Sequence, residues 1–87
     1  MATFDGSVIT EQGVTFAVAI VRSSVLDHPR QRDEAIVAFG AVFDGLPTIL
    51  MAQDSRGVPT YYGRQDLVDF MANVPLDAVP WSTYQTT

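Results

Sequence analysis

Hydrophobic and polar residues alternate along two segments near the start of the chain. A polar turn that contains Gly13 separates them, and apolar segments flanking such a turn are typical of a β-hairpin. From Val14 to Arg22 the alternation is strict, with bulky residues on one side of the strand and small but still apolar residues on the other. A strand that is apolar on both sides is usually central in its sheet. The pattern predicts a first hairpin over residues 3–22.

After Pro29 the apolar period lengthens to three and four residues. Pro29 itself suits the first turn of a helix, and Ile36, Phe39 and Phe43 then recur on one helical face. We predict a helix over residues 29–44. The remaining segments are predicted as a second hairpin over 47–62, a second helix over 64–74, and a C-terminal tail over 75–87 whose Trp81 folds back over the domain.

This order of elements predicts one α+β domain over residues 1–87. Two hairpin-plus-helix units fit a ββαββα two-layer sandwich, with a four-stranded antiparallel-type sheet and both helices on one face, a permuted ferredoxin-like arrangement. Right-handed crossovers then place the second and fourth strands side by side and parallel. The small-residue side of the second strand, with Ala17 and Ala19, is left uncovered in this arrangement. Because so apolar a face needs a cover, we expect a homodimer packed sheet to sheet or through a shared edge strand.

The composition narrows the range of functions. The chain has no cysteine and a single histidine, His28, so we expect no metal and no cofactor. All five basic residues are arginine, and with ten acidic residues the net charge is −5, which disfavours binding to nucleic acid. No apolar run is long enough to span a bilayer, and residues 1–5 lack the basic start of a leader. We therefore expect a cytoplasmic protein with no membrane partner.

Four side chains are candidates for ligand binding under the predicted topology. Parallel second and fourth strands would bring Arg22 and His28 to the same end of the sheet as Tyr62 and Arg64, next to two helix N-termini. Arginines and helix N-termini favour anions, and ligands often lie beyond the carboxyl ends of parallel strands. Each residue also has an ordinary alternative as a strand filler or a solvated end of an element.

The turn of the second hairpin carries Asp54 and Arg56, which are candidates for a turn-stabilising contact or a surface pair. The chain lacks a nucleophile elbow, a phosphate-binding loop and a dinucleotide-binding glycine pattern, so no catalytic residue is assigned and an enzyme is the less favoured class. Two hypotheses remain. One is a non-catalytic homodimeric interaction module, with another protein as a further partner. The alternative is a binder, or small enzyme, for a small anionic ligand at the carboxyl ends of the second and fourth strands.

Overall fold

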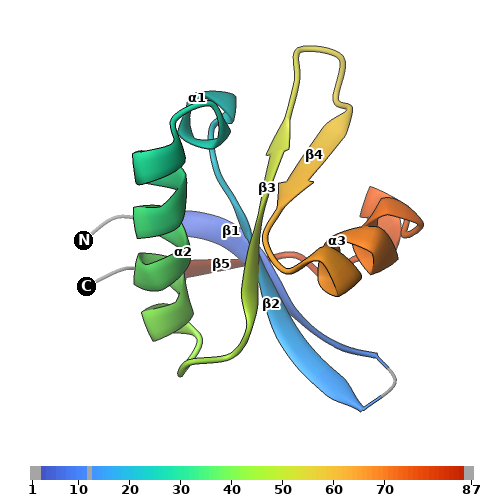
Figure 1. Ribbon diagram of the computed structural model, residues 1–87. Helices are drawn as coiled ribbons and strands as arrows, with labels where there is room; N and C mark the ends of the chain where they lie inside the picture. The colour runs from blue at the N-terminus through green and yellow to red at the C-terminus, as the bar shows by residue number, and fades with distance from the viewer. Residues whose placement is uncertain (1–2, 12, 86–87) are drawn as a thin grey trace.

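The computed structural model describes residues 3–11 and 13–85 (Figure 1). Gln12 of the predicted first turn and Thr86 and Thr87 of the predicted tail lie outside the described residues. In chain order the elements are β1 (Thr3–Glu11), β2 (Val14–Ile20), α1 (Ser23–Leu26), α2 (Pro29–Val42), β3 (Thr48–Gln53), β4 (Pro59–Tyr62), α3 (Gln65–Ala72), the 3₁₀ helix η1 (Leu76–Ala78) and β5 (Ser82–Gln85).

The strands form one mixed sheet of five strands in the order β4-β3-β2-β1-β5. The predicted α+β class is confirmed, but the predicted count of four strands is wrong because part of the tail pairs with β1 as β5. This fifth strand is only four residues long, and Tyr84 is its one apolar residue. So short and polar a segment carries no periodic signal, and only its pairing with β1 makes it a strand.

The parallel pair of the sheet is β2 with β3, not the predicted pair of second and fourth strands. Ala17 lies opposite Thr48 and Ile20 lies opposite Met51, while β4 runs antiparallel along the other edge of β3. A connection that contains a helix allows the following strand to run parallel to the preceding one. Here α1 and α2 connect β2 to β3, and β3 takes the position beside β2.

The two long helices lie on opposite faces of the sheet, whereas the sequence predicted both on one face (Figure 1). Helix α3 covers the bulky side of β2. Its Leu67 and Met71 are buried in one cluster with Phe16, Val18 and Ile49. This cluster supplies most of the large buried apolar side chains, so the main core lies between α3 and the sheet.

Helix α2 covers the small-residue side, which the sequence predicts to be uncovered. Ala17 and Ala19 are 0% exposed there, so this face of the sheet is not available to a second copy packed sheet to sheet. Their small side chains leave room for large ones from the neighbouring elements. Phe4 of β1 packs against Phe39 of α2, with 4.5 Å between ring centroids, and against Phe43 at 5.9 Å.

The tail crosses the α3 side of the sheet before it forms β5. The Trp81 indole nitrogen donates a hydrogen bond to the carbonyl oxygen of Leu76 at 2.9 Å, and the ring packs against the core, as predicted. The hydroxyl of Ser7, which is fully buried in β1, donates to the carbonyl oxygen of Pro80 at 3.1 Å. These contacts fix the course of the chain between α3 and β5.

The connection between β4 and α3 passes very close to β3 at Gly63. The backbone of Gly63 has a φ of +149°, and a Cβ placed on it would lie 2.6 Å from Cγ2 of Ile49. A side chain there would meet a fully buried residue, so this position requires glycine.

Candidate functional site

The structure does not bring the four predicted ligand-binding residues together. Extending the strand registers places Arg22 level with the end of β3 and Arg64 level with its beginning. Five residues of strand separate these two levels, which is about 17 Å at 3.3 Å per residue. The predicted convergence depended on a parallel second and fourth strand, and β4 in fact runs antiparallel to β3 and therefore to β2.

Arg64 directly precedes α3 and is engaged with a carboxylate of that helix. Its Nε and Nη2 each donate to one oxygen of Asp66 at 2.8 Å, a bidentate pair. The hydrogen bond between the side chains, together with the opposite charge, lowers the pKa of Asp66 and raises the pKa of Arg64. Both groups are exposed, so the pair marks the N-terminus of α3 without enclosing a site.

Tyr62 faces α2 from β4 and also has partners within the chain. Its hydroxyl donates to Oδ1 of Asp33 at 3.0 Å, and the guanidinium carbon of Arg32 lies 3.9 Å from the centre of its ring. A cation over an aromatic face is attracted by the ring's electron density. Tyr62 therefore ties the N-terminal half of α2 to the sheet.

His28 is the N-cap residue of α2, and Pro29 follows it in the first turn as the sequence predicted. The Nδ1 atom of His28 lies 2.7 Å from the carbonyl oxygen of Ser24 in α1. This hydrogen bond holds the short helix α1 against the start of α2. Among the described residues, no group of three histidine, aspartate or glutamate side chains could hold a metal ion.

The turn of the second hairpin is stabilised by Asp54. Its Oδ1 accepts hydrogen bonds from the backbone N–H groups of Arg56 at 2.8 Å and of Val58 at 3.0 Å. Arg56 thus meets Asp54 through its backbone, which is ordinary turn chemistry for an aspartate before glycine.

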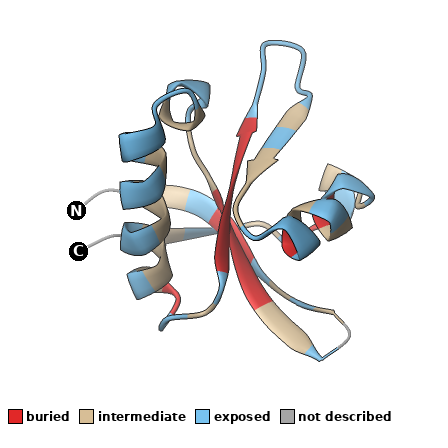
Figure 2. Ribbon diagram, viewed as in Figure 1, coloured by how far each residue is buried: buried red, intermediate tan, exposed pale blue. Residues whose placement is uncertain are grey.

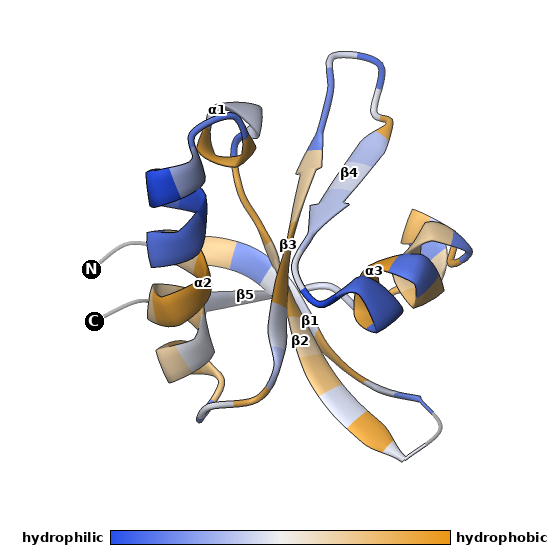
Figure 3. Cartoon of the chain, viewed as in Figure 1, coloured by the Kyte–Doolittle hydropathy of each residue, from blue (hydrophilic) through white to orange (hydrophobic). Residues whose placement is uncertain are grey.

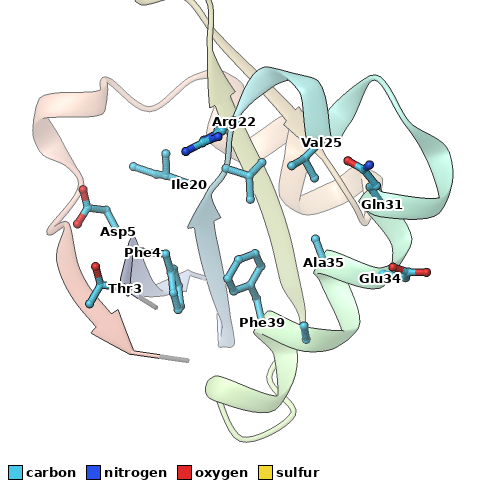
Figure 4. Close-up of a pocket in the computed structure, with 12 residues that line it drawn as sticks. Thr3, Phe4, Asp5, Ile20, Arg22, Val25, Gln31, Glu34, Ala35 and Phe39 are labelled. Carbon is cyan, nitrogen blue, oxygen red and sulfur yellow. The ribbon is translucent and has the colours of Figure 1, made fainter. Parts of the chain in front are cut away.

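A groove lies where β1, the end of β2, α1 and α2 meet (Figure 4), and it has a volume of about 780 Å³. In this view Phe4 and Phe39 lie next to each other, with Val25 and Ala35 on the helical side and Arg22 at the upper rim. Its apolar lining consists of Phe4, Ile20, Val21, Val25, Ala35, Ala38 and Phe39. The groove falls within the usual size range of small-molecule sites, and Arg22 is the one predicted site residue that borders it.

The second unusual surface is the outer side of α2. None of the residues of this helix is fully buried, and Figure 3 shows that its C-terminal half is hydrophobic whereas its N-terminal half is hydrophilic. Val37 is 75% exposed, more than any other large hydrophobic residue in the described part of the chain, and Ala38 and Ala41 beside it are also exposed. Figure 2 shows this side of the helix facing away from the sheet.

Sequence reasoning missed both surfaces. The residues from Ala35 to Phe43 include no polar side chain, so this part of α2 is apolar on all its sides. The helical spacing of Ile36 and Phe39 identifies only the side of the helix that faces the sheet, so the apolar character of the outer side is overlooked. Counting apolar residues on the outer side would have marked Val37 and Ala41.

No helix in the described part of the chain is both long and apolar enough to cross a bilayer. Comparisons with protein-family models, with curated proteins and with solved structures gave no match. The groove and the outer side of α2 are therefore the two candidate functional surfaces of the protein.

Proposed function

We propose that this protein is an interaction module that assembles as a homodimer through the outer face of α2. This outer face is defined by one stripe of the helix and the residue after its C-cap: Arg30, Glu34, Val37, Ala41 and Asp44. The observation that supports the proposal most directly is the 75% exposure of Val37 within a helical segment that carries no polar side chain.

An exposed helix in water normally has a polar outer side. Helices that are apolar on all sides are normally buried, because an apolar side chain lowers the free energy of the folded state when it is removed from water. The segment from Ala35 to Phe43 breaks this rule, since Phe43 is the only buried residue within it. A partner packed on Val37 and Ala41 would restore the usual environment.

A second copy of the chain fits this surface because the face carries a positive charge at one end and a negative charge at the other, and these meet when two copies pack antiparallel. The residues of the outer face are separated alternately by four and three positions, the spacing of a helix–helix seam. Arg30 stands seven residues before Val37, and Asp44 seven residues after it. An antiparallel pair of α2 helices with its two-fold axis near Val37 places each Arg30 opposite the Asp44 of its partner.

The expected dimer is modest in affinity. One pair of helices with small side chains at its centre covers less than the roughly 800 Å² per partner of a standard interface. We therefore expect dissociation constants in the micromolar range or weaker, where a specific contact is still measurable. Glu34 faces the apolar centre of the partner helix and adds no attraction.

Sedimentation velocity over a range of concentrations tests the proposal with two matched variants. Val37→Glu and Val58→Glu each add one negative charge at an exposed valine, the first on the outer face and the second, 53% exposed, beside the turn of the second hairpin. We expect the wild type and Val58→Glu to dimerise, and Val37→Glu to stay monomeric. A wild type that stays monomeric at millimolar concentration, or equal behaviour of the two variants, would contradict the proposal.

A charge exchange tests the antiparallel geometry. Arg30→Glu should weaken the dimer because it places like charges opposite each other, and adding Asp44→Arg to that variant should restore association. Failure of the double variant to recover would show that Arg30 and Asp44 do not face each other.

A further inference from the structure

The groove next to α2 has an apolar lining and a charged rim. Three charged side chains border it, namely Asp5, Arg22 and Glu34. Two of them have partners elsewhere: Oδ1 of Asp5 accepts a hydrogen bond from the Thr83 hydroxyl at 3.0 Å, and Glu34 lies 3.8 Å from Nε of Arg30 on the outside of α2. In Figure 4 the carboxyl groups of Asp5 and Glu34 point away from the centre of the groove.

The guanidinium of Arg22 has no such partner among the described residues. The salt bridges found there join Arg30 to Glu34 and Arg64 to Asp66. Arg22 is exposed, and it stands at the N-cap of α1 beside an apolar wall. An arginine presents a fork of N–H donors that matches a carboxylate, and next to an apolar surface that interaction is less screened by water.

We propose that this groove binds a small amphipathic carboxylate, a molecule with an apolar chain or ring and one carboxyl group. The apolar body lies against Phe4, Ala35 and Phe39, and the carboxylate accepts hydrogen bonds from Arg22. Gln31 also borders the groove, on the α2 side beyond Val25. The chemistry of the lining favours this class of ligand. Arg22 can pair with one negatively charged group, and the apolar residues below it offer no hydrogen-bond partners to a polar ligand such as a sugar.

The site is independent of the proposed dimer. Glu34 belongs to the outer face of α2 and also borders the groove, but the residues that carry the two proposals, Val37 with Ala41 and Arg22 with Phe4, belong to one surface each. Val37→Glu should therefore keep ligand binding, and a variant of Arg22 should keep the dimer, so that failure of one proposal can be told from failure of the other.

Titration of the ¹⁵N-labelled full chain with three probes of equal chain length tests the site. We expect octanoate to shift the amide signals of Phe4, Arg22 and Ala35 saturably, 1-octanol to bind about tenfold more weakly, and octylammonium to bind more weakly still. Equal affinities for octanoate and octanol, or signals that move only on the outer face of α2, would overturn the proposal. The absence of saturable binding up to the solubility limit of octanoate would also overturn it.

Matched variants locate the carboxylate. Arg22→Gln should weaken octanoate binding roughly 10- to 100-fold and leave octanol unchanged, because only the charged contact is lost. Arg56→Gln, which makes the same change of charge at the second hairpin, should leave both probes unchanged. Ala35→Leu should fill the groove and weaken both probes. If Arg22→Gln and Arg56→Gln affect octanoate equally, Arg22 does not hold the carboxylate.

Discussion

Replacing Gly63 by alanine should strongly destabilise the fold. Gly63 joins β4 to α3 with a φ of +149°, a value that residues with a side chain rarely adopt. A Cβ at this position would lie 2.6 Å from Cγ2, 3.0 Å from Cβ and 3.2 Å from Cα of Ile49. Ile49 is fully buried in the central part of the sheet, so neither its side chain nor its backbone has space to retreat.

Two costs add at this position. A side-chain-bearing residue in a sparsely populated region of backbone conformation costs about 1–3 kcal/mol. Forcing an extra methyl group into a packed core costs about 1–3 kcal/mol more. The expected loss is therefore about 2–6 kcal/mol. A domain of this size is stable by only about 5–10 kcal/mol, so Gly63→Ala should lower the melting temperature by more than about 10 °C.

Gly57→Ala provides the control, because Gly57 also has a positive φ, +81°, but its nearest neighbouring atom is the tip of Gln53 at 4.0 Å. It should show the backbone cost alone. Urea unfolding followed by the fluorescence of Trp81, the only tryptophan, gives both free energies of unfolding. If Gly63→Ala costs no more than Gly57→Ala, the close approach to Ile49 is not what requires glycine.

Two further predictions concern polar groups. The hydroxyl of Tyr61 is buried without a hydrogen-bond partner in the described part of the chain, and burial raises its pKa. Tyr61→Phe should therefore raise the free energy of unfolding by up to about 1 kcal/mol, and a loss in urea titration would reveal a partner. The pKa of Asp66 is lowered by its hydrogen bonds to Arg64, so the pair stabilises the fold above the ordinary pKa of 3.8 and ceases to do so as the pH falls through the lowered value. The small difference in melting temperature between wild type and Arg64→Gln should vanish in that acidic range, and NMR titration of the variant should show a higher pKa for Asp66.

The secondary structure was largely predictable because it depends on local patterns. The strict alternation after Val14 and the three- and four-residue spacing after Pro29 each belong to one kind of element, and strands and helices are found there. The fifth strand was not predictable, since Tyr84 is its only apolar residue and its pairing partner lies at the other end of the described chain.

The arrangement of the elements depends on contacts between distant residues, and the sequence pattern left it open. An apolar stripe such as Leu67 and Met71 shows that a helix has an inner side, but not which face of a sheet it covers. The small residues Ala17 and Ala19 predict an uncovered sheet face available to a dimer, whereas in the structure they are buried under α2, where Phe4 packs against Phe39 and against Phe43, the C-cap residue of α2. The predicted ligand site failed to assemble for the same reason, because it required a pair of parallel strands that does not form.

The first strand is shared by two pairings that differ greatly in sequence separation. One edge of β1 pairs with β2 through a local hairpin, and the other edge pairs with β5, with Thr3 opposite Gln85. Pairing β1 with β5 closes a loop that contains nearly all of the described chain. The loss of chain entropy on closing this loop must therefore be met before the stacking of Tyr84 on Phe4 can stabilise the pairing. We expect the two hairpins to form early in folding and the β1–β5 ladder to form last. Until then β1 keeps one unpaired edge, and a folding intermediate would be exposed to aggregation at that edge.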